Sequence, residues 1–370
     1  MSKARARPGD PVALIDTPAL VIDLDAMRRN LVCMAGFAAA HGMRLRPHAK
    51  MHKSAVIARL QTDAGAVGVC VQKTSEAEAL VAGGVPDIFI SNEVVAEAKL
   101  ARVAALAHRA RLAIAVDSQL GVQRLAQACK AAGSMVDVFV EIDVGQGRCG
   151  VAAAAAGALA QQVLAQGLRF AGLQAYHGRA QHLREPAQRE AAIGHAVAQA
   201  RTAQAGITAA GMPCPLVTGA GTGTFVYETA SGVYGELQAG SYLFMDRDYG
   251  DNQATPGAPR FEPALFLKSQ VMSRSTSHAV VDAGHKAHAI DSGLPAVWGR
   301  DLEFANGGDE HGILRARSDA LPNLGETVWL LPGHCDPTVN LHDHYVVVQG
   351  GLTQGHVTAL WPVDARGCTD

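Results

Sequence analysis

The chain has 370 residues, 48% of them hydrophobic and 18% charged, which suits one large barrel or two domains. Its formal net charge of -2 gives no electrostatic reason to expect a nucleic acid or an anionic membrane as a partner. No apolar run approaches the ~18 residues of a membrane span, no signal-peptide core follows the N-terminus, and the seven cysteines never form a Cys-x-x-Cys pair. These features predict a cytoplasmic protein.

Strand-like runs alternate with Ala-rich helical segments up to about residue 260. The predicted strands are Met43–Ala49, Ala66–Gln72, Asp87–Asn92, Arg111–Ser118, Val136–Val144, Phe170–His177, Pro215–Gly219 and Glu236–Phe244. Helices are predicted between them, among them Thr74–Ala82, Val94–His108, Val122–Ala132 and Ala152–Gln166. This α/β alternation predicts parallel βα units, and eight units without a break favour a closed (β/α)8 barrel over an open doubly wound sheet.

The two ends of the chain have a different character. Pro18–Leu24 is a short predicted strand, and Asp25 is the predicted cap of a helix over Met27–Ala40. After Phe261, alternating runs separated by Gly, Pro and Asn predict antiparallel strands over Ala264–Val271, Ala279–Asp282, Glu326–Leu331 and His344–Val348. We therefore expect a barrel over residues 25–260 and a C-terminal antiparallel β domain built from residues 1–24 and 261–370.

Lys50 stands where the first predicted barrel strand ends, in a basic and imidazole-rich segment that continues through His52 and Lys53. A lysine held among other cations tends to lose its proton and can act as an amine nucleophile. A solvated basic loop is the alternative. In parallel barrels the chemistry lies at the carboxyl ends of the strands, which here carry Lys50, Gln72, Asn92, Asp117, Arg148, Tyr176 and His177.

Glycine-rich segments follow the seventh and eighth predicted strands, at Gly219–Thr224 and Gly240–Tyr242. Barrels of this kind hold phosphate at these positions, because backbone N–H groups freed by glycine can point at an anion. A lysine after the first strand and a phosphate cradle after the last two are neighbours across a closed barrel mouth. That combination is what pyridoxal phosphate requires when it is held on a lysine Schiff base.

Six segments, in order, resemble the alanine racemase-like, fold-type III pyridoxal-phosphate enzymes, and within them the D-threonine aldolase and D-serine dehydratase family. The segments are Asp16–Leu20, Arg46–Lys50 with His52 and Lys53, Val71–Lys73, Asp143–Gly150, Thr218–Gly223 and Pro332–Thr338. They span nearly the whole chain. The resemblance implies pyridoxal 5'-phosphate as cofactor, a small-molecule substrate and a homodimer.

The resemblance also implies roles for individual residues. Lys50 matches the lysine that forms the Schiff base, and Arg148 the arginine that contacts the phenolate oxygen of the cofactor. Tyr176 and Gln72 fall beside the ring, and the phosphate contacts fall on Gly221, Thr222, Gly240, Ser241 and Tyr242. One position departs from the alanine racemases, which place an arginine opposite the pyridine nitrogen where this chain has Gln238. Racemase chemistry is therefore not expected.

His334 and Asp336 form a possible metal pair, because residues two apart in an extended segment point the same way. A plain turn before Pro337 is the alternative. The resemblance places a divalent ion beside the cofactor at these positions. The dehydratases of the family carry a thiolate at the second one, whereas an imidazole with a carboxylate favours Mn2+, with Mg2+ or Co2+ possible. These ligands lie in the predicted β domain.

With these residues in place, the resemblance implies a lyase that cleaves D-threonine and related β-hydroxy-D-amino acids to glycine and an aldehyde. His182 is the favoured base for the β-hydroxyl proton, and a solvated loop histidine is the alternative reading.

Three other functions were weighed against this prediction. A dehydratase acting on D-serine or D-threo-3-hydroxyaspartate would give a 2-oxo acid and ammonia. A non-catalytic pyridoxal-phosphate carrier would share the lysine barrel but not the C-terminal β domain or the metal pair. Gly145–Gly150 fits the dinucleotide fingerprint G-x-G-x-x-G, but the next predicted strand lacks the acidic residue at its end that this fingerprint requires.

Overall fold

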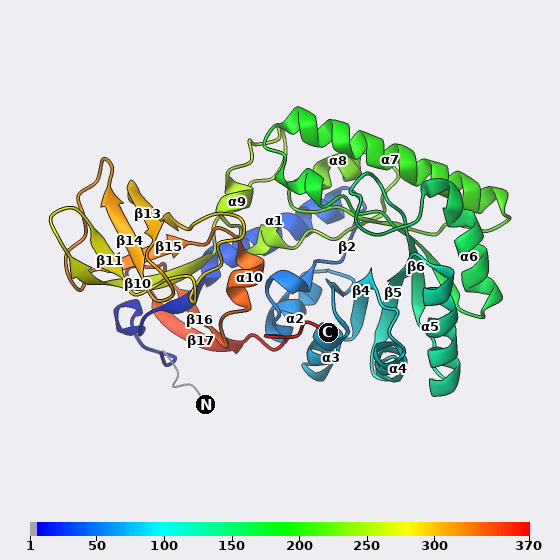
Figure 1. Ribbon diagram of the computed structural model, residues 1–370, viewed down its shortest axis with the longest axis horizontal. Coiled ribbons are helices and arrows are strands. Elements are labelled where there is room, and N and C mark those ends of the chain that lie inside the picture. The colour runs from blue at the N-terminus through cyan, green and yellow to red at the C-terminus, as the bar shows by residue number, and fades with distance from the viewer. Residues whose placement is uncertain (1–5) are drawn as a thin grey trace.

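The computed structural model describes residues 6–370. Two sheets lie at opposite ends of an elongated molecule, with helix α10 (Cys335–Val339) between them (Figure 1). The eight-stranded sheet is parallel, in the order β2-β9-β8-β7-β6-β5-β4-β3. Its strands are β2 (Arg44–Leu45), β3 (Val69–Val71), β4 (Asp87–Glu93), β5 (Arg111–Val116), β6 (Asp137–Glu141), β7 (Arg169–Gln174), β8 (Val217–Gly219) and β9 (Glu236–Leu237).

Backbone hydrogen bonds join the two ends of this sheet. His48 and Cys70 form a parallel bridge, and the amide of Cys70 donates to the carbonyl oxygen of Pro47 at 2.8 Å. The amide of Val67 donates to the carbonyl oxygen of Leu45, also at 2.8 Å. The sheet is therefore closed, and the predicted barrel with its eight strands is confirmed.

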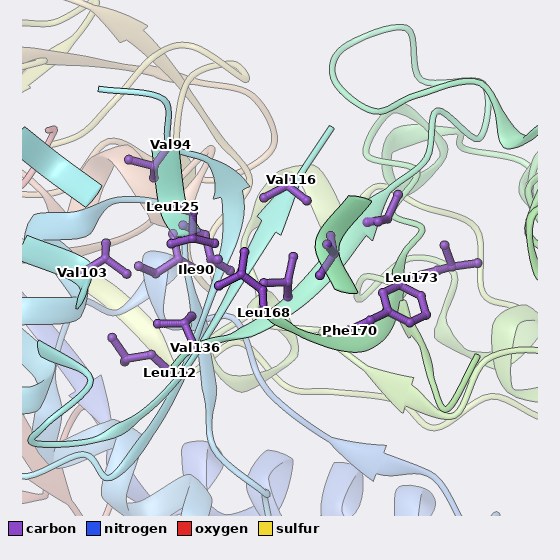
Figure 2. Packing of buried hydrophobic residues seen from close by; sticks show 14 of the residues in the cluster. Ile90, Val94, Val103, Leu112, Val116, Leu125, Val136, Leu168, Phe170 and Leu173 are labelled. Carbon is purple, nitrogen blue, oxygen red and sulfur yellow. The ribbon is translucent and has the colours of Figure 1, made fainter. Parts of the chain in front are cut away.

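Amphipathic helices cover the outside of the barrel because each strand is apolar on the face that it turns outward. Figure 2 shows Ile90 from strand β4 close to Leu125 from one of the covering helices. Burying side chains of this size stabilises the fold by ~1.5–3 kcal/mol each relative to exposure. The helices are α2 (Ala55–Asp63), α3 (Thr74–Ala82), α4 (Glu97–Leu106), α5 (Gln119–Ala132), α6 (Ala156–Ala165), α7 (Pro186–Ala209) and α8 (Phe225–Ala230). None of the described helices is both long and apolar enough to cross a bilayer.

The second sheet combines the two ends of the chain. Its central strand β1 (Ala19–Asp23) pairs antiparallel with β10 (Leu265–Arg274), as expected, but parallel with β16 (His344–Gln349). The prediction of a wholly antiparallel sheet is therefore wrong at this one pairing. The remaining strands are β11 (Ala279–Val281), β12 (Ala296–Val297), β13 (Leu302–Asn306), β14 (Gly312–Ala316), β15 (Thr327–Leu331) and β17 (His356–Pro362).

The connection from β1 to the barrel is a helix without a loop. Helix α1 (Leu24–Ala40) begins directly after β1, and the carboxylate of Asp23 accepts hydrogen bonds from the amides of Asp25 and Ala26. The cap is therefore Asp23, and the predicted cap Asp25 lies in the first turn. The strand ends at Asp23, one residue earlier than predicted, and the helix starts at Leu24, so the capping position lies two residues before the predicted one.

The amino-terminal mouth of the barrel holds a charged network. Arg46, with a side chain only 6% exposed, lies 2.6 Å from Asp87 and 3.2 Å from Glu236, which is 1% exposed. Arg44 also contacts Glu236, at 3.0 Å. Buried charges of this kind stabilise the fold only while they remain paired.

Arg46→Met is expected to lower the free energy of unfolding by about 3 kcal/mol, because it leaves Glu236 and Asp87 partly uncompensated in a dry site. Chemical denaturation measures the loss. Arg29→Met is the control: its pair with Glu262 is about half exposed on both sides, at 58% and 52%, and should cost under about 1 kcal/mol. Equal losses in the two variants would contradict this account of the network.

Candidate active site

A cavity of about 200 Å³ opens at the carboxyl ends of the barrel strands. Residues at the ends of seven barrel strands line it, together with two residues at the start of helix α10, so the site lies where the barrel meets α10. The lining consists of His48, Lys50, Met51, Gln72, Ser91, Arg148, Gln174, Tyr176, His182, Ala220, Gly221, Thr222, Gln238, Gly240, Ser241, Tyr249, His334 and Asp336. Most of the predicted site residues are therefore brought together.

Lys50 lies in a short 3-10 turn, Ala49–Met51, that follows β2. Its Nζ atom is 3.0 Å from Oδ2 of Asp336. Asp336 raises the pKa of Lys50, against the opposing effects of burial and of Arg148. The expectation that neighbouring cations lower this pKa is therefore wrong, because a carboxylate distant in sequence faces the amine more closely than any cation does.

Asp336 and His334 are close, but not for the predicted reason. The segment is not extended: His334 is the N-cap residue of α10 and Asp336 lies in its first turn. Nε2 of His334 is 3.6 Å from Oδ1 of Asp336, and that oxygen is buried without a hydrogen-bond partner. Nδ1 of His334 is held at 2.7 Å by the carboxylate of Asp291. A free imidazole nitrogen, an unpartnered carboxylate oxygen and a second carboxylate that orients the ring are what a divalent cation site requires.

The loop after β8 presents unpaired amides to the cavity. Ala220 has a left-handed backbone with φ of 69°, and over residues 6–370 the amides of Gly221 and Thr222 donate to no other protein group. A Cβ on Gly221 would lie 2.4 Å from Oε1 of Gln181, and one on Gly240 would lie 2.7 Å from the carbonyl oxygen of His48. Only glycine allows this approach, and the loop forms a concavity suited to an anion.

Tyr242 differs from the other predicted phosphate contacts. Its side chain is fully buried in the hydrophobic core that also contains Phe244 and Tyr345, and it does not line the cavity. The backbone amide of Tyr242 donates a hydrogen bond to Oγ1 of Thr222 at 2.9 Å. Tyr242 therefore supports the cradle by orienting Thr222.

Arg148 and Tyr176 form one wall of the cavity. The guanidinium carbon of Arg148 is 5.8 Å from the centre of the Tyr176 ring, within the range of a cation–π contact. Burial raises the pKa of Tyr176, so the phenol stays neutral. At the closed end, Nε2 of Gln238 donates to Gln174 at 2.7 Å and to Thr218 at 2.8 Å. Gln238 is thus held in a neutral amide network.

His48 was not predicted as a site residue, yet it contacts two that were. Its Nδ1 atom accepts from the amide of Lys50 at 3.3 Å, which places the ring proton of the neutral form on Nε2. That nitrogen can donate to the hydroxyl oxygen of Ser91 at 3.2 Å, whereas the side-chain nitrogen of Gln72, 2.9 Å away, is itself a donor. Burial, and then the charge of Lys50, lowers the pKa of His48 well below its usual value, so His48 is a neutral brace between the backbone of Lys50 and Ser91.

His182 enters the cavity from a 3-10 turn, Arg179–His182, after β7. Its Nδ1 atom is 2.5 Å from Oδ2 of Asp248, whose other oxygen accepts from Arg184. Asp248 lies in the short helix α9 (Arg247–Gly250). A carboxylate that holds one imidazole nitrogen leaves the other facing the cavity, as a general base requires. The sequence gives no signal for Asp248, which is 66 residues from His182.

The pKa of Asp248 is lowered to about 2: burial raises it, but the hydrogen bonds from His182 and Arg184 outweigh burial. Because this is below the unfolded value of ~3.9, the carboxylate stabilises the fold above that pH and ceases to do so as the pH falls toward 2. Asp248→Asn should therefore have a lower melting temperature than the wild type at neutral pH, and this difference in melting temperature should disappear in acid. Asp251→Asn, an exposed neighbour, is the control. A gap that does not change with pH would refute this prediction.

Comparison with known proteins gave two family matches and several close relatives. Residues 22–248 match the alanine racemase N-terminal domain, and residues 264–348 match a putative serine dehydratase domain. The chain is 46% identical to a D-threonine aldolase of Arthrobacter sp., over 98% of this chain and 96% of that protein. It is 44% identical to a 3-hydroxy-D-aspartate aldolase of Paracoccus denitrificans (strain Pd 1222), over 98% and 95%. The crystal structure of a D-threonine aldolase from Filomicrobium marinum superposes with a TM-score of 0.97 at 48% identity, covering 99% of this chain and 100% of that one.

Proposed function

The chain belongs to the family that joins an alanine racemase N-terminal domain to a serine dehydratase domain, and we propose that it cleaves β-hydroxy-D-amino acids to glycine and an aldehyde. D-Threonine is the proposed substrate, with related β-hydroxy-D-amino acids. The observation that carries the proposal is the 3.0 Å contact between Nζ of Lys50 and Asp336. It brings an amine nucleophile and a candidate metal ligand together in one cavity.

The residues of the cavity fit pyridoxal phosphate. Lys50 would carry it, the free amides of Gly221 and Thr222 with the hydroxyl of Ser241 would hold its phosphate, and Arg148 would meet its phenolate oxygen. When bound, pyridoxal phosphate supplies an electron sink for the electrons released at Cα. Gln238, engaged with Gln174 and Thr218, offers the pyridine nitrogen no positive charge.

His334 and Asp336 would hold a divalent ion, which lowers the pKa of a coordinated hydroxyl. The unpartnered oxygen of Asp336 and the orientation of His334 by Asp291 support this assignment. We propose Mn2+, with Mg2+ or Co2+ as alternatives, because one imidazole and one hard carboxylate favour these ions over those that prefer thiolate.

His182 is the proposed base for the β-hydroxyl proton. It lines the same cavity as His334 and Asp336, and Asp248 fixes its orientation and stabilises the imidazolium that forms. His48, kept neutral by burial, accepts from the backbone amide of Lys50 without competing for that proton. We further propose that the enzyme is a cytoplasmic homodimer.

The alternative reaction is dehydration, which would give a 2-oxo acid and ammonia. The match to a putative serine dehydratase domain supports this alternative. Asp336 favours the aldolase, because a hard carboxylate stands where the resemblance puts a thiolate in dehydratases. Incubation with D-threonine, pyridoxal phosphate and Mn2+ should give glycine and acetaldehyde in equal amounts, measured by chromatography. A product mixture made only of 2-oxo acid and ammonia would reverse the assignment.

Asp336→Ala should lower the rate of D-threonine cleavage by at least about a hundredfold, since it removes both a metal ligand and the carboxylate beside Lys50. The variant should still bind pyridoxal phosphate and show its yellow absorbance, because the phosphate cradle is intact. Added Mn2+ should not restore activity. Asp343→Ala, an exposed neighbour that pairs with Arg366, is the control. Wild-type turnover by Asp336→Ala in the presence of a chelator would remove the metal from the mechanism.

A further inference from the structure

Three acidic residues and one thiol lie close together beside the cavity, next to Arg148. Glu93 ends β4, Glu141 ends β6, and Asp117 follows β5, while Cys149 is next to Arg148 in the chain. One oxygen each of Glu93 and Asp117 and the sulfur of Cys149 all lie within 4.8 Å of one another. None of these four groups lines the cavity, so the mechanism leaves them unused.

The carboxyl groups of Glu93 and Glu141 have few partners. Glu141 is only 3% exposed, and its Oε2 atom is buried without a hydrogen-bond partner among residues 6–370. Both carboxyl oxygens of Glu93 are likewise buried without a hydrogen-bond partner in this part of the chain. Arg148 is the cation of the cluster, with Nη2 at 3.8 Å from Oε1 of Glu141. Asp117 is engaged elsewhere, since it accepts from the amide of Gly150 at 3.2 Å.

Two ionised carboxylates cannot share so dry a site at low cost. Burial, then the charge of Glu93, raises the pKa of Glu141 to about 9, while Arg148 opposes this effect and Asp117 adds to it. Burial and the nearby charges of Glu93 and Glu141 also raise the pKa of Cys149 to about 11, so the thiol keeps its proton.

We propose that Glu141 and Glu93 share a single proton, and that the resulting acid–carboxylate pair is the positioning device that holds Arg148 at the wall of the cavity. The proton on Glu141 is donated to a Glu93 oxygen, which leaves this pair with one negative charge facing the positive charge of Arg148. A second negative charge would draw the guanidinium away from Tyr176 and into the cluster. With one charge, Arg148 is held yet keeps N–H groups free for the cavity.

The role of Arg148 toward the cofactor rests on the proposed function, but the shared proton does not. Above the ordinary pKa range of a carboxyl group, Glu141 is ionised in the unfolded chain. The wild-type protein must therefore take up a proton at Glu141 when it folds. Its contribution to stability is therefore greatest below that range and declines as the pH rises toward about 9. Glutamine at this position removes the charge and the decline.

Melting curves of Glu141→Gln and wild type over this pH range test the pair directly. We expect the melting temperature of Glu141→Gln to rise relative to wild type as the pH increases, whatever its value in acid. Glu97→Gln, which removes an exposed carboxylate after β4, controls for the change in net charge. A difference that is flat or falls with pH would mean that Glu141 is ionised, and would overturn the proposal.

Cofactor binding tests the positioning role. Glu141→Gln keeps a neutral hydrogen-bonding group and should bind pyridoxal phosphate as wild type does, whereas Glu141→Ala should bind it roughly tenfold more weakly. Equal weakening in both variants would show that Arg148 needs a charged partner and would contradict the proposal. If wild type itself fails to bind pyridoxal phosphate, the proposed function fails while the melting curves still decide the shared proton.

A cation could balance the cluster in place of the proton. Adding zinc chloride should change the melting temperature of the wild type by no more than it changes that of Cys149→Ser. A zinc-dependent stabilisation that Cys149→Ser lacks would mean that Glu93, Asp117 and Cys149 hold a metal ion, and would overturn the shared proton.

Discussion

The contact between Lys50 and Asp336 is the constraint on which the rest of the site depends. Lys50 comes from the barrel, whereas Asp336 comes from α10, next to the second sheet. The site exists only if both are held in register. Asp246 helps to fix that register, because one of its oxygens accepts from the amide of Cys335 and the other from the amide of Tyr249. The amide of Arg247 likewise donates to the carbonyl oxygen of Pro332 at 3.0 Å.

The chemistry follows from the way in which charge is distributed around this contact. Lys50 and Arg148 bring positive charge to the lining of the cavity, while the neutral side chains of Gln238 and Gln174, also in the lining, hydrogen-bond to each other. Two side chains with proposed roles have a carboxylate that fixes their orientation: Asp291 holds His334 and Asp248 holds His182. His48 holds Lys50 through its backbone amide. Such supporting contacts are what hold reacting groups to a productive geometry.

Much of this arrangement could be predicted from the sequence, because strand periodicity and glycine-rich loops are local signals. They placed Lys50 and the phosphate cradle at the mouth of a barrel. The supporting carboxylates could not be predicted, since Asp248 and Asp291 reach their histidines only through the fold. The errors have the same origin. The pKa of Lys50 depends on Asp336, and His334 with Asp336 lies at a helix start whose capping geometry a three-residue pattern does not reveal.

Borohydride reduction in the presence of pyridoxal phosphate, followed by peptide mass mapping, tests the central claim most directly. The account predicts a pyridoxyl group on Lys50 alone. Neighbouring Lys53 serves as an internal control, because its amine contacts Glu76 at 2.9 Å and the carbonyl oxygens of Ala365 and Cys368. A pyridoxyl group on Lys53 or any other lysine, or on none, would contradict the account.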